Sequence, residues 1–545
     1  MASADDTRPS ASNDTSVTHE QKVEPPATAS NSATSSQGRI VGKLNAFLAE
    51  WGVETNGIEP VPMEERKDSR WYQMFFIWFG VNMNILTFST GTAGPAFFGL
   101  GIKPSLVIIA IVDAIFSVIP AISAVFGPKI GTRAMVQARF SWGYWGGIVP
   151  SVLNVVSMEG FLVIDCIIGG QILASVSDGR LDDTLGIVII SLISLFVTFC
   201  GYRVIHVYET YAWIPPVITL ITMLAVGYPD LQANLRAPSP PLTAAGVLSF
   251  STTLASSVLS WCTMSPDYGV YHSPKASSWR IFFYVYLGFF LPSLTCHMIG
   301  AAFAAAAPSV PSWNTGFDDA SDLGGLIYAV LLRAGGWGKF LTVVNALSVP
   351  ALTAPTMYTF GTSFMAIPTP GRGNWFARVP RWVYVLISEA ILIPVAIVGA
   401  KTFYNTLVDV LDIIGYWSAA FAAIVLVEHF LYRRAFTEAA YSTPTRAWAS
   451  SSLLPSSIPA LVAFACAVGV LVLFMSQVWW EGPVAQRGTG DLGIYAMGVV
   501  AGGVYAVLRG VERRLRRRTM DGKGGAEIDV DAQGAEESVE TEEKA

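Results

Sequence analysis

The chain has 545 residues, of which 52% are hydrophobic and only 14% are charged, and its mean hydropathy is +0.48. Because soluble domains carry roughly a quarter of charged residues, this composition excludes an ordinary soluble protein. The net charge of −6 says little about the apolar part, since much of the acid lies in the C-terminal tail. The five cysteines lie in apolar segments without a CxxC spacing, so neither a disulfide framework nor a metal site is expected.

Three regions differ in composition. Residues 1–70 form an N-terminal tail that we expect to be largely disordered, because its first part is rich in Ser, Thr, Ala, Asn and Asp without an apolar period. This tail also lacks the apolar segment of a signal peptide. Residues 71–510 are expected to form a transmembrane domain, and residues 511–545 a second disordered tail that is first basic, at Arg513–Arg518, and then acidic.

Apolar runs of about twenty residues recur along residues 71–510, and each can cross a hydrocarbon core of roughly 30 Å as a helix. We therefore predict an all-α polytopic membrane protein with about twelve transmembrane helices. Residues 307–335 are polar at first and then partly apolar, which favours a short surface helix there. The twelve predicted spans lie at about residues 72–98, 103–126, 145–175, 185–203, 211–228, 245–272, 280–306, 336–364, 380–399, 407–432, 456–476 and 491–509.

The loops between the predicted spans differ in charge. If both termini are cytoplasmic, the inner loops and adjoining span ends carry most of the Lys and Arg residues, such as Lys129, Arg133 and Arg433. The outer loops lean acidic, with Asp182 and Asp322 among their residues. Since an excess of Lys and Arg marks the cytoplasmic side, we expect both termini to be cytoplasmic.

Two predicted spans contain polar and helix-breaking residues at depth. The first includes Asn82, Asn84 and Pro95, and the sixth includes Trp261 and Asp267 among several Ser and Thr residues. Gly and Pro free backbone groups that lipid cannot satisfy, so protein, water or a ligand must do so. Because the two breaks fall at corresponding positions of two halves, they predict a transporter with inverted repeats. Two ordinary Gly- or Pro-kinked helices are the alternative.

The third span places chemically distinct side chains on one face. Asn154, Met158, Phe161 and Asp165 share a helical stripe at about 100° per residue. An amide, an aromatic ring and a carboxylate on one face would suit a flat heterocycle. Glu159 lies on a different face of the same helix. A carboxylate in mid-membrane is a functional hypothesis by default, and a structural hydrogen bond to a neighbouring helix is the alternative for both acids.

Other polar residues within the spans favour structural roles. Asp113 and Glu389 have no polar neighbours in sequence. His206 and His297 are interpreted as helix–helix hydrogen-bonding residues, and a role as proton carriers is the alternative. Trp261 could either stack on a ligand ring or act as an interfacial anchor. In the eighth span, Thr356 lies on a stripe that Pro350 and Pro355 distort, so this stripe predicts no definite geometry.

No catalytic signature is present. The sequence contains no P-loop, HExxH, GxSxG or haem motif, so we expect neither enzymatic activity, nor a cofactor, nor ATP drive. A secondary transporter is favoured, with the lipid bilayer, protons and a small heterocycle as partners and without a nucleic-acid partner. A nutrient sensor on a transporter fold and an integral-membrane enzyme are the alternatives of other classes.

A series of motifs resembles the fungal purine-cytosine permeases of the nucleobase–cation symporter family. The loop Gly127–Gly143 is long and specific. Each of the other motifs is only moderately specific by itself, but together, in this order along the chain, they are highly specific. They are Gly57–Arg66, Asn82–Gly91, Gly169–Gln171 and Asp267–Tyr268. The resemblance covers roughly residues 45–510.

The resemblance implies the five-plus-five inverted repeat of the sodium-coupled amino-acid transporters, with spans one and six broken. It also implies proton-coupled uptake of cytosine, purines or related heterocycles through a central site between spans one, three, six and eight. We expect a plasma-membrane location. The substrate-binding residues expected from these arguments are Asn82, Asn84, Asn154, Phe161, Asp165, Trp261 and Thr356, and the proton-coupling candidates are Asp165, Glu159 and Asp267.

The chain departs from the permease pattern at two of these positions. Asp165 stands where the permeases usually have Asn, and Thr356 stands where they usually carry Asn directly after a proline. A site built for particular hydrogen bonds discriminates strongly when its partners change. The carboxylate of Asp165 would favour ligands with more N–H donors or a positive charge. A vitamin such as pyridoxine or thiamine, carried by sister transporters of the family, is therefore the alternative substrate.

Overall fold

The computed structural model describes residues 57–177, 179–199, 211–318, 322–369, 375–442 and 444–521. Most of the N-terminal tail and the acidic C-terminal tail, both expected to be disordered, lie outside the described residues. Within the described part, the regular structure is almost entirely helical. The one exception there is a two-stranded antiparallel hairpin formed by β1 (Ser476–Gln477) and β2 (Trp480–Glu481).

The helices of the first five predicted spans follow the sequence prediction closely. They are α2 (Tyr72–Asn82) and α3 (Ile85–Ala96) for span one; α4 (Ile102–Phe116), α5 (Val118–Ala124) and α6 (Phe126–Ile130) for span two; α8 (Ile148–Ser175), α9 (Asp183–Phe199) and α11 (Ile214–Arg236) for spans three to five, with α7 (Ala134–Gly146) between spans two and three.

The remaining spans begin with the second interrupted helix. They are α12 (Ala244–Leu259) with the 3₁₀ turns η2 (Ser260–Thr263) and η3 (Ser265–Gly269), α13 (Ser278–Ala306), α16 (Gly336–Ala346) with α17 (Pro350–Ala366), α19 (Arg381–Gly399), α20 (Phe403–Val427) with the π-helical turn η7 (Glu428–Arg433), α22 (Ile458–Phe474) and α23 (Gly493–Asp521). The short helices outside them include η1 (Met63–Glu65), α14 (Pro311–Phe317), α15 (Leu323–Leu331), α18 (Trp375–Arg378) and α21 (Pro444–Ala447).

The spans differ in how they reach the length that a bilayer requires. Among the described residues, eight helical stretches are long and apolar enough to cross a membrane, and Trp382–Arg433 covers two predicted spans. Spans four and eleven are shorter apolar helices. Span one consists of two pieces of 11 and 12 residues. At 1.5 Å per residue neither piece crosses about 30 Å alone, so the two must act together.

The break in span one has a local cause. Met83 (φ −82°, ψ 68°) and Asn84 (φ −143°, ψ 175°) leave the helical region, and the side-chain Oδ1 of Asn84 accepts a 2.8 Å hydrogen bond from the Thr87 backbone N–H. Asn is a preferred N-cap because its side chain satisfies one of the free N–H groups of the first turn. Span six breaks in turn after Leu259, where α-helix gives way to 3₁₀ turns. The predicted interruptions of spans one and six are thus confirmed.

Span eight is divided as well. α16 ends at Ala346 and α17 begins at Pro350, a position where the missing N–H of proline costs nothing. Pro355 lies inside α17 without ending it. The first proline therefore separates two helices, whereas the second is tolerated in mid-helix.

The expected short surface helix between spans seven and eight is only half right. A helix does form at α15, but most of its residues are buried, and it packs against α8, α14 and α16. Its apolar residues thus serve the interior of the protein. The prediction of a surface position was wrong because a nine-residue apolar helix can be either a surface or a core element until its neighbours are known.

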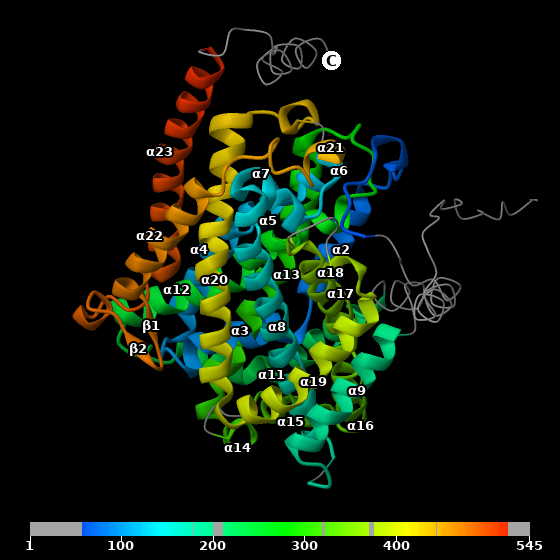
Figure 1. Ribbon diagram of the computed structural model, residues 1–545. Helices are drawn as coiled ribbons and strands as arrows, with labels where there is room; N and C mark the ends of the chain where they lie inside the picture. The colour runs from blue at the N-terminus through cyan, green and yellow to red at the C-terminus, as the bar shows by residue number, and fades with distance from the viewer. Residues whose placement is uncertain are drawn as a thin grey trace, which may run out of the picture. The chain divides into compact units, whose positions relative to one another are not determined.

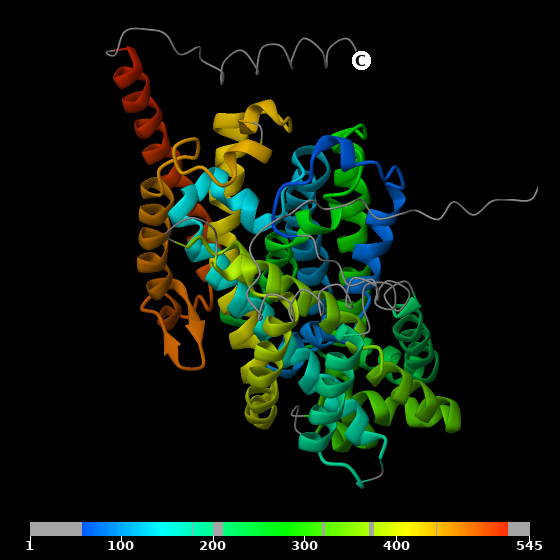
Figure 2. The ribbon, with the colours of Figure 1, turned by 45° about the vertical axis from the view of Figure 1, so that its right-hand side comes forward.

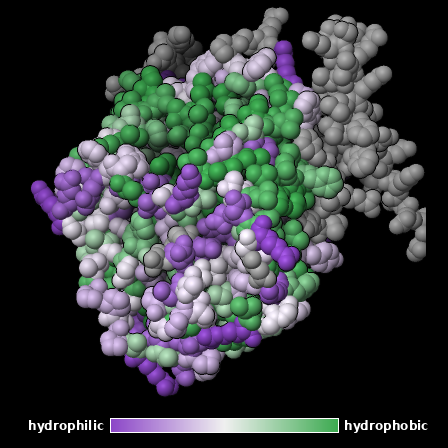
Figure 3. All heavy atoms as spheres, turned by 90° about the horizontal axis from the view of Figure 1, so that it is seen from below, coloured by the Kyte–Doolittle hydropathy of each residue, from purple (hydrophilic) through white to green (hydrophobic). Residues whose placement is uncertain are grey.

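The arrangement of the helices places α3 and α8 centrally and α22 with α23 at the side (Figures 1 and 2). α6, α7 and α21 lie at one end of this body and α14 at the other (Figure 1). Seen from the α14 end, hydrophilic residues cover much of the face and hydrophobic residues gather toward one margin (Figure 3). On α4, Val107, Ile111 and Ile115 are each more than half exposed at a spacing of four, which is the apolar stripe that a lipid-facing helix requires.

α3 and α13 approach each other more closely than ordinary side chains allow. A Cβ added at Gly91 would lie 2.1 Å from the His297 backbone oxygen, and one added at Gly300 would lie 2.1 Å from the Phe88 backbone oxygen. Small residues that let backbones meet are the usual basis of tight helix packing in membranes. This contact fixes the position of α13 relative to the broken span.

Candidate functional site

A small cavity lies where the break of span one meets spans three, six, seven and ten. Its free volume is about 20 Å³, which is room for a water molecule and far less than a heterocycle needs. The polar atoms of α3 and α13 lie opposite the aromatic rings and aliphatic groups of α8, η2 and α20. It is lined by Asn82, Asn84, Leu86, Thr87, Thr90, Phe161, Ser257, Val258, Trp261, Ser293, His297 and Leu411.

The aromatic pair singled out in the sequence borders this cavity. The rings of Phe161 and Trp261 are nearly parallel, at 18°, with centroids 5.9 Å apart. A flat ligand between two parallel rings requires about 7 Å, which is two carbon–carbon contacts of roughly 3.5 Å. Trp261 is backed by Trp78 in an edge-to-face contact at 5.8 Å. A sandwiched ligand would therefore require a small separation of α8 from η2.

The two asparagines of span one differ in their hydrogen bonding. Asn84 uses both ends of its amide locally, since it accepts from Thr87 and donates to the Val81 carbonyl. Asn82 donates to the Trp78 carbonyl at 2.9 Å, and its Oδ1 has no partner among the described residues. Asn84 thus builds the break, whereas Asn82 has an acceptor left for a ligand.

The other expected binding residues lie away from this cavity. Asn154 donates a 2.8 Å hydrogen bond to Ser363, which joins α8 to α17, and Thr356 donates to the Leu352 carbonyl within α17 at 2.8 Å. Asp165 is buried one helical turn beyond Phe161, and its Oδ1 has no hydrogen-bond partner among the described residues. Their roles in binding stay predictions.

Two of the three proton-coupling candidates are held by hydrogen bonds outside the cavity. Glu159 accepts a 2.6 Å hydrogen bond from Ser388 of α19. Asp267 accepts a 2.6 Å hydrogen bond from the Ala134 backbone N–H, at the start of α7. Both roles in coupling likewise stay predictions. Among the described residues, no group of three or more His, Cys, Asp or Glu side chains could hold a metal ion.

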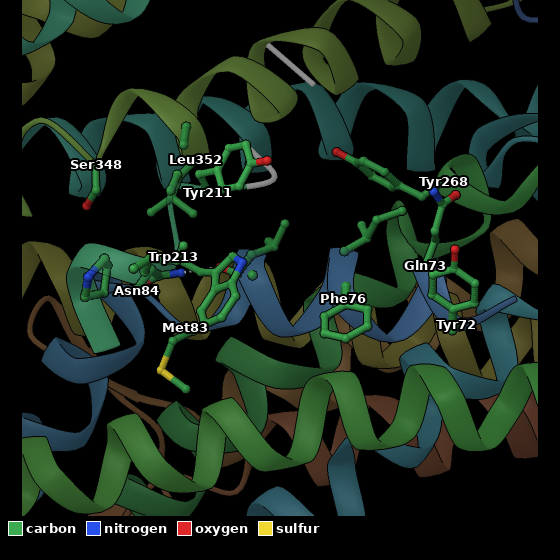
Figure 4. A pocket seen from close by; sticks show the side chains of 17 residues that line it. Tyr72, Gln73, Phe76, Met83, Asn84, Tyr211, Trp213, Tyr268, Ser348 and Leu352 are labelled. Atoms are coloured by element: carbon green, nitrogen blue, oxygen red, sulfur yellow. Dashed lines mark hydrogen bonds between the residues drawn. The ribbon is translucent and has the colours of Figure 1, made fainter. Parts of the chain in front are cut away.

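A larger pocket of about 390 Å³ adjoins the break at Met83 and Asn84. It lies within the roughly 300–1,000 Å³ typical of ligand pockets. Figure 4 shows Tyr72 and Gln73 of α2 at one end and Asn84 and Ser348 at the other, so the pocket runs along α2 down to the break. Trp213 and the backbone at the start of α11 supply another wall.

The comparisons with known proteins show the family of the chain. The family model described as "Permease for cytosine/purines, uracil, thiamine, allantoin" matches residues 60–493. The chain belongs to this family. It is 33% identical to the purine-cytosine permease FCY21 of Saccharomyces cerevisiae over 83% of this chain and 84% of that protein. It is also 25% identical to the vitamin B6 transporter TPN1 of Saccharomyces cerevisiae, over 89% and 92% of the two chains.

A solved structure shows the fold. The nucleobase-cation-symport-1 family transporter Mhp1, in a closed conformation with bromovinylhydantoin bound, matches with a TM-score of 0.59 at 18% identity, over 84% of this chain and 96% of that one. The chain is therefore a multi-pass membrane transporter of the cytosine/purine permease family, with the fold of Mhp1, and its relatives are transporters rather than enzymes. The resemblance noted from the sequence is confirmed.

Within this permease fold, sequence reasoning missed the contributions of spans seven and ten. Ser293, His297 and Leu411 line the cavity, as do Thr87 and Thr90 of α3. His297 had a visible signal, since a histidine inside an apolar span is rare, but a single sequence does not say which way it points. Span eight, expected at the central site, lines the larger pocket instead, through Ser348 and Leu352.

Proposed function

We propose that this permease carries out proton-coupled symport of a nucleobase such as cytosine or a purine, with the base bound between Phe161 and Trp261. One observation carries the proposal: the break of span one and this parallel pair border the same cavity. Backbone groups freed at a helix break and facing rings together suit a flat, polar, hydrogen-bonding ligand.

Alternating access supplies the route. The larger pocket reaches Asn84 along α2 from Tyr72 and Gln73, at the end of the body where α6 and α7 lie (Figure 1), whereas the cavity beside the paired rings has room only for a water molecule. We infer that this end is cytoplasmic, that both termini lie there, and that the protein works in the plasma membrane. The excess of Lys and Arg at this end supports that orientation.

A vitamin is the second candidate substrate. Asp165 replaces the amide expected in permeases, and its buried Oδ1 lacks a partner among the described residues. A cationic or N–H-rich ring such as that of pyridoxine or thiamine would supply one. The relationship to a vitamin B6 transporter supports the same alternative. A sensor on this fold is the remaining alternative, and it would bind a ligand without accumulating it.

An uptake screen separates these functions. Cells that lack their own carriers would express the full chain and receive labelled cytosine, adenine, hypoxanthine, uracil, allantoin, pyridoxine or thiamine. Concentrative uptake of cytosine or a purine that a protonophore abolishes is the expected result. Uptake of pyridoxine or thiamine alone would show that the substrate is a vitamin, the second candidate, and not a nucleobase. Binding without accumulation would indicate a sensor, and accumulation that survives the protonophore unchanged would contradict proton coupling.

A further inference from the structure

Asp113 and His297 form a buried pair between spans two and seven. Nδ1 of His297 lies 2.9 and 3.1 Å from the two carboxylate oxygens of Asp113, and the side chains are 1% and 0% exposed. We propose that His297 is the binding site of the coupled proton and that Asp113 positions it. This inference rests on the proposed proton symport and names the residue that performs the coupling.

The geometry sets the tautomer of the ring. A carboxylate at Nδ1 holds the proton on that nitrogen, so the neutral ring presents a free lone pair at Nε2. The same carboxylate stabilises the imidazolium that forms when Nε2 takes up a proton. Nε2 points away from Nδ1 and has no hydrogen-bond partner among the described residues. The pair is thus arranged to gain and lose a proton at Nε2.

His297 meets the site rather than the lipid. It lines the central cavity together with Ser293 from the same helix and Thr87 and Thr90 from α3. The Gly91 contact presses its backbone against α3, so the ring cannot retreat from the break without separating the two helices. A proton on Nε2 therefore lies where a bound heterocycle would present its acceptors.

Other ionisable groups around the pair are few. α4 contributes Asp113 itself and Lys103, which is near the start of that helix. On α13 the neighbouring thiol of Cys296 lies 3.5 Å from the sulfur of Met83, and Tyr286 donates to the Ala114 carbonyl. α2, α3 and α5 carry no Asp, Glu, Lys, Arg or His, although Tyr72 begins α2.

α11, which also packs against α13, places its charges near its C-terminal end, where Asp230 pairs with Arg333. Arg236 is the last residue of that helix, and Tyr228 is exposed. The described residues thus give Nε2 no competing charge at the cavity.

The coupling follows from reciprocity. With the cavity open to the proton-rich side, Nε2 binds a proton, and the imidazolium donates a hydrogen bond to a ring nitrogen or carbonyl oxygen of the substrate. After the site opens to the other side and the substrate leaves, the proton passes from Nε2 to water. A proton that strengthens substrate binding must itself be bound more tightly when substrate is present. Neither Glu159 nor Asp267 lines the cavity in this way.

The test uses the full chain in proteoliposomes with the substrate found in the uptake screen. Three readouts separate the steps: counterflow exchange at equal pH, uptake driven by an inward proton gradient, and proton uptake triggered by substrate. The variants are His297→Gln and Asp113→Asn. His429→Gln is the matched control, because His429 is also buried but bonds Tyr441 at 2.9 Å, away from the cavity.

We expect His297→Gln to keep only a reduced counterflow, because the substrate loses the hydrogen bond from the imidazolium. The variant should also lose roughly tenfold or more of the acceleration by the gradient and take up no proton with substrate. Asp113→Asn should shift the pH profile of gradient-driven uptake to lower pH, because the imidazolium loses its counter-charge. Asp113→Glu should move the profile back. His429→Gln should behave as the wild type.

Substrate-triggered proton uptake of wild-type size and pH profile in His297→Gln would overturn the inference while leaving proton symport intact. If that variant does not fold, an unshifted profile in Asp113→Asn would overturn it equally. The same loss in Asp165→Asn, with His297→Gln unaffected, would transfer the role to Asp165. Absence of proton coupling in the wild type would instead overturn the proposed function, and the inference with it.

Discussion

In the proposed binding mode, the distance between Phe161 and Trp261 links ligand binding to helix movement. With centroids 5.9 Å apart, the rings leave too little room for a flat ring between them. Opening the pair by about an ångström requires a shift of α8 against η2, and that shift would be driven by the ligand itself. We therefore expect the two rings to separate when a substrate of the right shape binds.

Removing either ring should weaken substrate binding. Phe161→Ala and Trp261→Ala are each expected to cost about 1–3 kcal/mol, or roughly 5- to 150-fold in Kd, as stacked bases do elsewhere. Equilibrium binding to purified protein measures this directly. Phe161→Tyr keeps the ring and should bind with near wild-type affinity. Unchanged affinity in both alanine variants would mean that the rings only pack against each other.

Asp165 should decide between nucleobases and cationic ligands. Asp165→Asn restores an amide at a buried position whose oxygen lacks a partner among the described residues. We expect it to shift preference toward cytosine and purines and to weaken any cationic substrate, as measured by competition uptake. Glu159→Gln, on another face of α8, is the control and should leave the order of substrates unchanged. An unaltered order and pH profile in Asp165→Asn would assign this carboxylate a structural role.

Among the helical elements, the contact of α3 with α13 is the one that holds the broken span in place. Gly91→Ala would place a methyl group 2.1 Å from a backbone oxygen, which a side-chain rotation cannot relieve. We expect a clear loss of thermal stability and of transport. Gly503→Ala on α23 meets no atom within 4 Å and should be neutral or slightly stabilising, because alanine favours helix. Equal melting temperatures for the two variants, measured on purified protein, would contradict this.

The α15 element should make stability depend on pH through its cap. Asp322 accepts a 2.8 Å hydrogen bond from the Gly325 N–H, and burial raises the pKa of Asp322 from 3.8 to about 7. Because the pKa of Asp322 is raised in the folded protein, its protonation contributes to the free energy of unfolding. This contribution is fully present below about pH 3.8 and is lost as the pH rises through 7. Asp322→Asn keeps the cap without a charge.

We therefore expect Asp322→Asn to raise the melting temperature at pH 8 more than at pH 5. Comparing the variant with the wild type at both pH values removes the contribution of other titrating groups, such as Asp183. An equal shift at the two pH values would indicate that the cap ionises normally in the folded protein.

For the whole molecule, the larger pocket should be reachable from one side of the membrane. Gln73→Cys lies at its outer end and Ser348→Cys at its depth, in a background in which Cys200 and Cys466 are replaced by serine. An impermeant thiol reagent should label both from the cytoplasmic side. Thr315→Cys, exposed on α14 at the opposite end, should label only from outside. Labelling of Ser348→Cys only from outside would reverse the proposed orientation.

Much of this protein could be read from local sequence alone. The lengths of the apolar runs predicted the spans, because a helix must reach a minimum length to cross a bilayer. Polar and helix-breaking residues determined the interruptions, because a broken helix in lipid needs partners that Asn84 supplies within its own segment. The stripe on span three placed Asn154, Phe161 and Asp165 on one face of a helix, but of these three only Phe161 lines the cavity.

Only the tertiary structure decided which faces meet. In the folded protein Asn154 forms a hydrogen bond with Ser363, and Glu159 forms one with Ser388. His297 of span seven lies at the wall of the cavity beside Asp113. These partners lie more than 180 residues apart, so no local pattern relates them. Periodicity predicts which residues share a face of one helix. What that face touches depends on helix packing, which is set by contacts such as that of Gly91 in α3 with the backbone of α13.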